Sequence, residues 1–211
     1  MRKVAVSGTE GYAEQARSLL APYENCRTEE VHADFLPHFP TLPSQIIDIG
    51  SGTGRDAAWF AGNGHKVLAV EPTAELRETA ARLHPSQRID WLDDSLPELA
   101  IVRKLKRNFD LVMMSAVWMH LNESARRLAM VHITSIMAPS AKLFITLRHG
   151  PVPEDRIMYN VSAEETINLA SQNGLELLLN THGNSIQPQN KARGVTWNRL
   201  AFQNRPDSAG Q

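Results

Sequence analysis

Short apolar runs alternate with stretches of helical periodicity from residue 46 onward. Each apolar run has the length of a buried strand, and the segments between them repeat their apolar residues every three or four positions. Asn122 is placed to cap the last of these helices, and Pro139 to end it. The pattern predicts strands at 46–49, 66–70, 89–92, 109–114 and 142–147, and helices at 55–62, 97–107 and 123–137 with a fourth after Thr73.

The last part of the chain departs from this alternation. Ser162-Ala-Glu-Glu165 matches a capping box that opens a helix, and Gly174 would end it. Strands are predicted at 175–179 and 195–202, with a polar loop at 180–194 between them. Because no helix separates these two strands, we expect them to be antiparallel neighbours.

Together these elements predict a doubly wound α/β fold, with a seven-stranded, mainly parallel sheet and an antiparallel last strand. Residues 11–36 are expected to be helical, with a break near Pro22. Prolines 37, 40 and 43 mark a boundary before the first strand. We therefore predict an N-terminal helical cap at 1–45, the main domain at 46–202 and a flexible tail at 203–211.

Composition narrows the class of protein. The 211 residues carry 22 Lys and Arg against 23 Asp and Glu, a net charge of −1, so no global charge draws the chain to nucleic acid or to an anionic membrane. Cys26 is the single cysteine, which excludes an internal disulfide. The eight histidines lack zinc-ligand spacing, so no metal is expected. The longest apolar run, 111–119, is too short to span a membrane, and a cytoplasmic protein is predicted.

The segment Asp48-Ile-Gly50-Ser51-Gly52-Thr-Gly54-Arg55 joins the first strand to the first helix of the sheet. Glycines at such a junction let the backbone approach a ligand closely. A dinucleotide fingerprint would need its third glycine at position 55, which is arginine. The charge of Asp48 would repel a pyrophosphate and attract an ammonium or sulfonium group. The loop therefore favours a cationic or zwitterionic cofactor.

Acidic residues follow the next two strands. Glu71 comes directly after the second strand, about 20 residues past the glycine loop, where a carboxylate can accept both hydroxyls of a ribose. Asp93 and Asp94 end the third strand, where one can accept the amino group of an adenine and the other can cap the next helix. We assign the ligand role to Asp94.

These motifs, with Ala69-Val-Glu71-Pro, Leu92-Asp-Asp94 and Phe109-Asp-Leu-Val-Met-Met114, resemble the ordered motifs of class I S-adenosylmethionine-dependent methyltransferases. The resemblance covers residues 46–202, and the final strand pair is similar to the sixth and seventh strands of that family. It implies S-adenosylmethionine as cofactor, with S-adenosylhomocysteine as product. By this resemblance the cofactor would be held by Asp48, Gly50, Ser51, Gly52, Gly54, Glu71, Pro72, Asp94, Ser95 and Ser115.

Candidates for the chemistry should follow the fourth and fifth strands. His149, directly after the fifth strand, is the first choice as general base, and His120 is the second. Arg148 is placed to bind an acidic acceptor. Tyr12 and Tyr159 are further candidate substrate contacts, and the segment 150–160 is a candidate lid.

The sequence favours methyl transfer to a small molecule. The basic residues at 103–107 lack the interleaved aromatics of an RNA site, so no nucleic-acid partner is expected. Three alternatives stay open at this point: a nucleic-acid or protein acceptor, a nicotinamide-dependent oxidoreductase, and a cofactor-binding protein without activity. The acceptor and the oligomeric state do not follow from the sequence.

Overall fold

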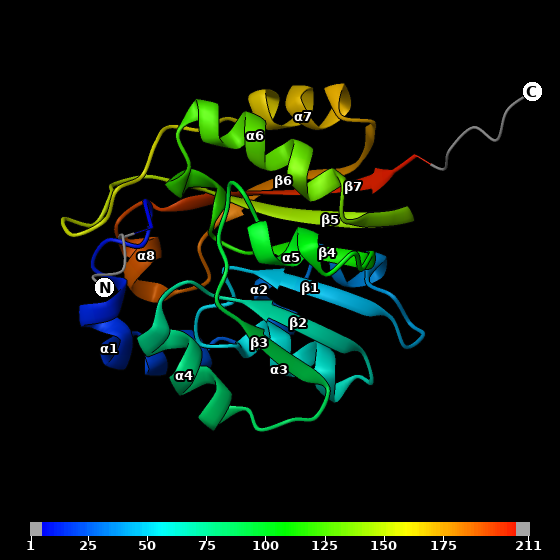
Figure 1. Cartoon of the computed structure of the whole chain (residues 1–211). Coiled ribbons are helices and arrows are strands. Elements are labelled where there is room, and N and C mark those ends of the chain that lie inside the picture. The colour runs from blue at the N-terminus through cyan, green and yellow to red at the C-terminus, as the bar shows by residue number, and fades with distance from the viewer. Residues whose placement is uncertain (1–5, 206–211) are drawn as a thin grey trace, which may run out of the picture.

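The structure is a computed structural model that describes residues 6–205. The strands and helices alternate along most of the chain, in the order that Figure 1 shows from blue to red. The strands are β1 (Gln45–Ile49), β2 (Lys66–Val70), β3 (Ile89–Leu92), β4 (Phe109–Met114), β5 (Met137–His149), β6 (Leu175–Asn184) and β7 (Thr196–Asn204). The helices are α1 (Tyr12–Glu24), α2 (Thr28–Val31), α3 (Arg55–Gly62), α4 (Ala74–Leu83), α5 (Ala100–Lys104), α6 (Glu123–Thr134), α7 (Ala163–Gln172) and α8 (Pro188–Ala192), with 3-10 turns η1 (Leu36–His38) and η2 (Trp118–His120).

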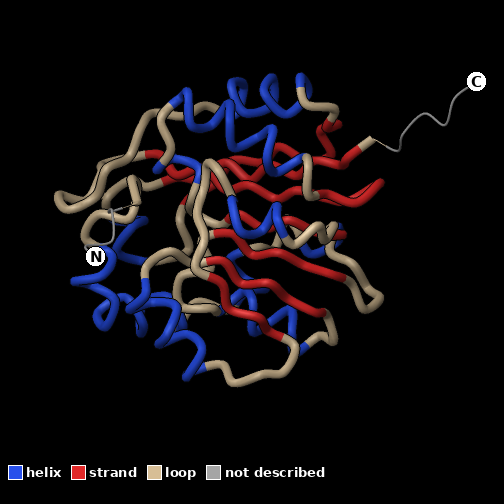
Figure 2. Tube along the Cα trace, in the orientation of Figure 1, coloured by secondary structure: helices blue, strands red, loops and turns tan. Residues whose placement is uncertain are grey.

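The seven strands form one sheet in the order β3-β2-β1-β4-β5-β7-β6. Strands β1 to β5 are parallel to one another, whereas β7 runs antiparallel to both β5 and β6. Figure 2 shows the strands between helices on both sides. The fold is therefore the doubly wound α/β sheet with an antiparallel last strand that the sequence predicts.

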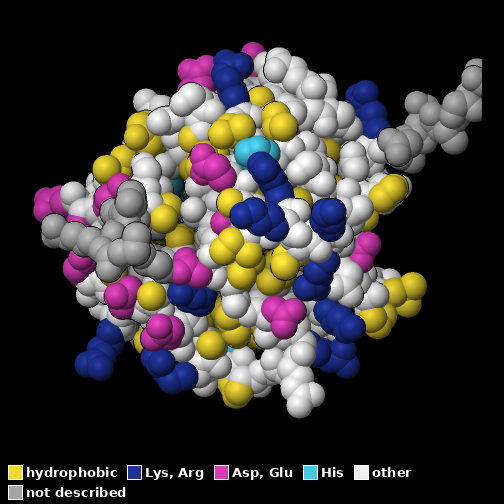
Figure 3. All heavy atoms as spheres, in the orientation of Figure 1, with side chains coloured by type: hydrophobic (Ala, Val, Ile, Leu, Met, Phe, Trp, Pro, Cys, Tyr) yellow, Lys and Arg dark blue, Asp and Glu magenta, His cyan; other side chains and the backbone are white. Residues whose placement is uncertain are grey.

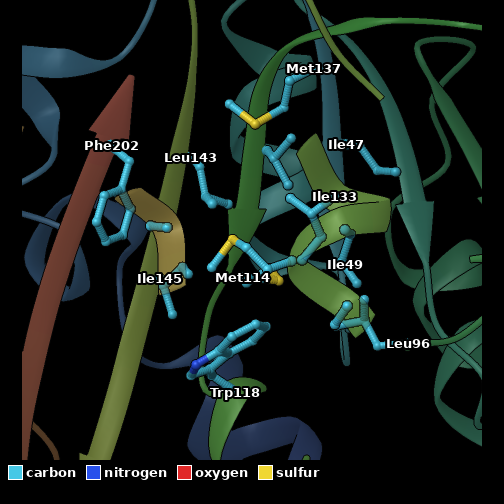
Figure 4. Packing of buried hydrophobic residues seen from close by; sticks show 14 of the residues in the cluster. Ile47, Ile49, Leu96, Met114, Trp118, Ile133, Met137, Leu143, Ile145 and Phe202 are labelled. Atoms are coloured by element: carbon cyan, nitrogen blue, oxygen red, sulfur yellow. The ribbon is translucent and has the colours of Figure 1, made fainter. Parts of the chain in front are cut away.

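Two apolar clusters fill the two sides of the sheet. One joins the central strands to α5, α6 and α7. Figure 4 shows its middle, where Met114 of β4 lies against Ile145 of β5, its partner in register, with Trp118 of η2 close by. The other cluster joins α3 to the segment before β1, where Phe35 and Phe39 contact Phe144. Burial of this kind is the main favourable term in folding.

A buried polar cluster ties the N-terminal segment to α3. Both oxygens of Asp56 accept hydrogen bonds from the guanidinium of Arg55, and the same carboxylate is bonded by Thr28 and His32, each at 2.9 Å. The neighbouring positive charges hold the pKa of Asp56 well below its usual range despite burial. Residues 28–39 therefore pack as part of the main body. The division at residue 45 stays a prediction.

Most predicted elements occur where expected. The strands at 66–70, 89–92 and 109–114 and the helix at 55–62 have the predicted bounds. Asn122 caps α6 through its side chain, and Ser162 caps α7 in the same way. Thr73 occupies the N-cap position of α4 but makes no side-chain capping bond.

Several boundaries differ from the predictions. The helix expected at 97–107 is shorter and consists of α5 alone. The Asp94 carboxylate accepts from amides at its start. The helix ends before Lys106, whose φ is 51°. Helix α6 stops at Thr134, so Met137 and Pro139 belong to β5, at a point where its register with β4 shifts.

Strand β6 continues to Asn184 along β7, and α8 follows it, so most of the predicted loop 180–194 is strand or helix. Residues 203 and 204 belong to β7, and 206–211 lie outside the described residues.

The N-terminal segment, α8 and the segment 150–160 gather at the carboxyl ends of the parallel strands, on the left in Figure 1. Arg156 from that segment donates to the side-chain oxygen of Gln15 on α1, and Gln15 in turn donates to Asp155. These contacts hold the two segments together above the sheet. Among the described residues, no helix is both long and apolar enough to cross a membrane.

Candidate cofactor and acceptor site

The strand order reverses at β1, which pairs with β2 on one side and β4 on the other. The loops beyond the carboxyl ends of such strands diverge and leave room for a ligand. A cavity of about 360 Å³ lies at this point. It is lined by the glycine loop, by residues after β2 to β5, and by the N-terminal segment, α8 and residues 153–158.

The three glycines of the loop differ in their surroundings. All have a positive φ, of 71° at Gly50, 56° at Gly52 and 86° at Gly54, which other residues seldom adopt. A Cβ at Gly50 would lie 2.5 Å from the side chain of Val117, whereas one at Gly52 would meet open space. Gly50 and Gly52 line the cavity, but Gly54 packs under Trp91 and does not. The predicted contact of Gly54 with the cofactor stays a prediction; in the structure Gly54 is the N-cap residue that turns the chain into α3.

Asp48 supplies a buried carboxylate at the floor of the cavity. The side chain is 2% exposed, and its Oδ2 has no hydrogen-bond partner among the described residues. Burial, strengthened by the negative charge of Asp56, raises the pKa of Asp48 well above its usual range. A ligand that brings a positively charged donor would satisfy this oxygen.

Asp48→Asn is expected to stabilise the protein and to weaken cofactor binding. An ionised Asp48 lacks a full set of partners, so removing its charge should raise the free energy of unfolding near neutral pH by about 1 kcal/mol. This gain should shrink as the pH falls through the raised pKa of Asp48. It should vanish below the ordinary aspartate value of 3.8, where Asp48 of the wild type is protonated in both the folded and the unfolded protein. Titration calorimetry with S-adenosylhomocysteine should show at least ~10-fold lower affinity. Asp110→Asn, an exposed carboxylate on β4, should do neither; equal affinity in Asp48→Asn would refute the assignment.

Glu71 lies beside the glycine loop, at the end of β2. Its Oε2 accepts from the Gly52 N–H at 2.9 Å and its Oε1 from the Thr73 N–H at 2.8 Å. Burial raises the pKa of this carboxyl, although both amide donors act in the opposite direction. The two amides fix the carboxylate in one orientation, with one lone pair on each oxygen left for a ligand.

Asp94 lines the cavity together with Pro72 and Ser95. Its Oδ1 accepts from the Ser95 N–H, and its Oδ2 accepts from the Ile101 and Val102 amides at 2.8 Å. Of the two aspartates, Asp94 is therefore the one that caps the next helix. It also lines the cavity. Asp93 forms an ion pair with Arg77 instead.

Tyr12 and His120 meet across the cavity. The Tyr12 hydroxyl lies 3.1 Å from Nε2 of His120, and Nδ1 of that ring lies 2.9 Å from the Ile157 carbonyl oxygen. Because a carbonyl oxygen only accepts, Nδ1 carries the proton and Nε2 accepts from the tyrosine. Burial lowers the pKa of His120 and raises that of Tyr12, so both are neutral near pH 7. The guanidinium of Arg156 lies 3.9 Å above the tyrosine ring and fixes its position.

Arg148 and His149 are neighbours at the end of β5 and have different surroundings. Arg148 lines the cavity, as does Thr146, because alternate residues of a strand share a face. His149 does not line it; its Nε2 bonds the side chain of Asn198 at 2.8 Å, and it lines a second cavity of about 380 Å³ together with Arg148 and Tyr159. Tyr159 is also absent from the lining of the cavity beside the glycine loop and is partly exposed. His149 as general base and Tyr159 as substrate contact stay predictions, and His120 is the candidate base within the cavity beside the glycine loop.

Several lining residues had no clear signal in the sequence. Tyr23 and Gln15 reach the cavity from α1, and Gln187 and Asn190 from the segment that was expected to be a loop. A proline at the first position of α8, after the polar Gln187, was the one hint that a helix begins there. Ser51 and Ser115 line the cavity, as the resemblance implies.

A doubly wound sheet with a glycine-rich turn and a carboxylate after the second strand defines a Rossmann-like, nucleoside-cofactor-binding protein. Residues 12–190 match the family described as methyltransferase domain, and the chain belongs to that family. It is a class I S-adenosylmethionine-dependent methyltransferase, with S-adenosylmethionine as cofactor. The family assignment decides against the nicotinamide alternative.

Comparison with curated proteins gives no match. Among solved structures, the chain is similar to the N-methyltransferase NodS of Bradyrhizobium japonicum, with 14% identity, a TM-score of 0.70, and 93% of this chain and 98% of that one covered. The 1,6-didemethyltoxoflavin-N1-methyltransferase of Burkholderia thailandensis has 18% identity, a TM-score of 0.60 and coverages of 93% and 79%. The magnesium protoporphyrin IX methyltransferase of Synechocystis has 12% identity, a TM-score of 0.64 and coverages of 96% and 88%. At these identities the likeness concerns the fold.

Proposed function

We propose that the protein transfers the methyl group of S-adenosylmethionine to a small molecule enclosed in the cavity. The observation that carries this proposal is the continuity of the cavity, which extends from Gly52 and Glu71 to Tyr12, His120 and Arg148. Two of the similar structures are named for small-molecule acceptors, 1,6-didemethyltoxoflavin and magnesium protoporphyrin IX. The cavity volume of about 360 Å³ lies in the range typical of small-molecule sites.

The residues at one end of the cavity fit the cofactor. Glu71 would accept the ribose hydroxyls, and the unpartnered Oδ2 of Asp48 would attract the positively charged part of the molecule. Pro72, Asp94 and Ser95 would border the adenine, with Ser51 and Ser115 nearer the sulfur. When bound, the cofactor supplies a methyl group already activated on a sulfonium.

Tyr12 and His120 would remove a proton from the acceptor. The acceptor N–H or O–H would donate to the Tyr12 oxygen, and the tyrosine proton would pass to Nε2 of His120 as the acceptor atom takes the methyl group; the sulfur–methyl bond would break and S-adenosylhomocysteine would be the leaving group. The Ile157 carbonyl keeps the proton on Nδ1 and so leaves Nε2 free to accept. The methylated acceptor leaves, and the histidine returns its proton to water. Enclosure by α1 and residues 153–158 would exclude water during transfer.

The basic residues of α5 and the turn after it do not extend the site. None of Arg103, Lys104, Lys106 or Arg107 lines the cavity. On the face in Figure 3, which includes α5, Lys and Arg side chains are mixed with hydrophobic and acidic ones. Because these basic residues do not line the cavity, they do not form a basic surface continuous with the site, and this supports the small-molecule proposal.

Incubation with methyl-labelled S-adenosylmethionine and a cell extract tests the acceptor class. The extract is separated into small-molecule and macromolecular fractions, and each is supplied to the enzyme in turn. Label transferred to the small-molecule fraction is the expected result. Label transferred to protein or nucleic acid alone would overturn the proposal.

Tyr12→Phe is expected to lower kcat at least ~10-fold while leaving cofactor affinity unchanged. The substitution keeps the ring beneath Arg156 and removes the hydroxyl that bonds His120. Turnover is measured as S-adenosylhomocysteine release on an acceptor found by the labelling experiment. Tyr159→Phe, outside the cavity, serves as control; a Tyr12→Phe variant with full kcat would exclude the hydroxyl from proton transfer.

A further inference from the structure

Arg148 brings an uncompensated positive charge to the acceptor end of the cavity. Its side chain is half-buried, and no hydrogen bond or ion pair joins it to any residue in the range 6–205. Partial burial lowers the pKa of the guanidinium, but it remains far too basic to lose its proton near neutral pH. A desolvated charge without a partner is unfavourable unless a ligand supplies one.

The other arginines that line the cavity all have acceptors. Arg55 forms two bonds with Asp56, and Arg156 donates to the Gln15 side chain and the Glu10 carbonyl. Arg199 lies 3.8 Å from Asp34. Among the lining arginines that the structure describes, Arg148 alone has no partner, and it faces the ligand space.

The titratable groups around Arg148 do not neutralise it. Those near enough to act on its charge are Tyr12, Tyr23 and Arg193. Burial raises the pKa of both tyrosines, so their hydroxyls stay protonated, and Arg193 adds positive charge. The buried carboxylates of Asp48 and Glu71 belong to the glycine-loop end of the cavity. The cavity is thus acidic at its cofactor end and basic at the other.

We infer that the methyl acceptor is a small carboxylic acid whose carboxylate binds Arg148 and whose N–H or O–H faces Tyr12. The inference rests on the proposed function and adds the chemical class of the acceptor. A single unpaired guanidinium matches one singly charged, planar carboxylate, whereas a phosphate dianion would call for a second free cation. Trp197, the partner of Arg148 across β5 and β7, also lines the cavity and offers an apolar surface to the body of the acid.

Binding of acids and their amides tests this assignment. The protein is saturated with S-adenosylhomocysteine and titrated with a panel of small aromatic and aliphatic amino and hydroxy acids. Each acid is paired with its primary amide, and phosphate monoesters of similar size form a third arm. The same panel is applied to Arg148→Met and to Arg193→Met, an exposed arginine nearby that does not line the cavity.

At least one acid is expected to bind ~10-fold or more tightly than its amide, the scale of a charged hydrogen bond. Arg148→Met should abolish this preference, and Arg193→Met should retain it. The inference is overturned if no acid binds more tightly than its amide, if phosphate monoesters bind more tightly than the acids, or if Arg148→Met keeps the preference. Failure to bind S-adenosylhomocysteine would instead count against the proposed function, and that measurement comes first.

Discussion

His120→Gln is expected to lower turnover by about 10²–10⁴-fold, the usual contribution of a positioned general base. Glutamine is of similar size and stays neutral, but it has no nitrogen that can take up a proton at Nε2. Cofactor affinity should stay at the wild-type level, because His120 contacts Tyr12 and Ile157 and lies apart from the glycine loop. The measurement is single-turnover methyl transfer beside titration of S-adenosylhomocysteine.

The matched control is His149→Gln, because His149 bonds Asn198 away from the cavity and should be dispensable. The pH profile provides a second readout. Burial lowers the pKa of His120, so the wild-type rate should decline on the acid side only below the ordinary histidine value of 6.5. His120→Gln should lose this acid limb. Unchanged turnover, or a loss matched by His149→Gln, would remove His120 from the mechanism.

Glu71→Gln is expected to weaken the binding of S-adenosylhomocysteine by ~10-fold to 100-fold. The carboxylate would form charged hydrogen bonds with the ribose hydroxyls, each worth about 1.5–3 kcal/mol. The amide of glutamine would also oppose one of the two backbone N–H groups, of Gly52 and Thr73, that orient the native side chain. Titration calorimetry measures the effect.

Glu78→Gln, an exposed carboxylate on α4, is the control for charge and should bind as the wild type does. A thermal melt of each variant separates a local loss of affinity from a loss of folding. Wild-type affinity in a folded Glu71→Gln protein would disprove the ribose assignment.

The predicted strands of the sheet follow from local information. A buried parallel strand needs an apolar run, and the runs at 66–70 and 109–114 end at polar or glycine-rich turns that define their limits. The glycine loop was predictable for the same reason, because its conformation is determined within a few residues. The end of α6 was not, since Met137 and Pro139 belong to β5 through pairing with a distant strand.

The sequence alone could not show which of the two adjacent polar residues that end β5 lies at the cavity beside the glycine loop. Both directly follow the apolar part of β5, yet only Arg148 lines the cavity beside the glycine loop, while both line the second cavity. Nothing local tells which face holds the cavity. The contact of Tyr12 with His120 joins positions 108 residues apart, and its geometry depends on how α1 packs over the sheet. Such long-range placement is beyond a single sequence.

The exposed positions of α6 illustrate the same limit. Leu128 and Val131 belong to the apolar repeat of this segment in the sequence, yet they are 40% and 50% exposed. The buried face holds Ala129, Met130 and Ile133, together with Arg126, whose charge is paired with Glu165. Periodicity located the helix, but the choice of its buried face depended on a partner that only the folded chain provides.

A crystal structure with S-adenosylhomocysteine tests the central claim most directly. We expect the ribose hydroxyls on the Glu71 carboxylate, and the sulfur turned toward the Tyr12 hydroxyl and His120. A nucleoside bound away from Glu71, or a sulfur facing away from Tyr12 and His120, would contradict the account.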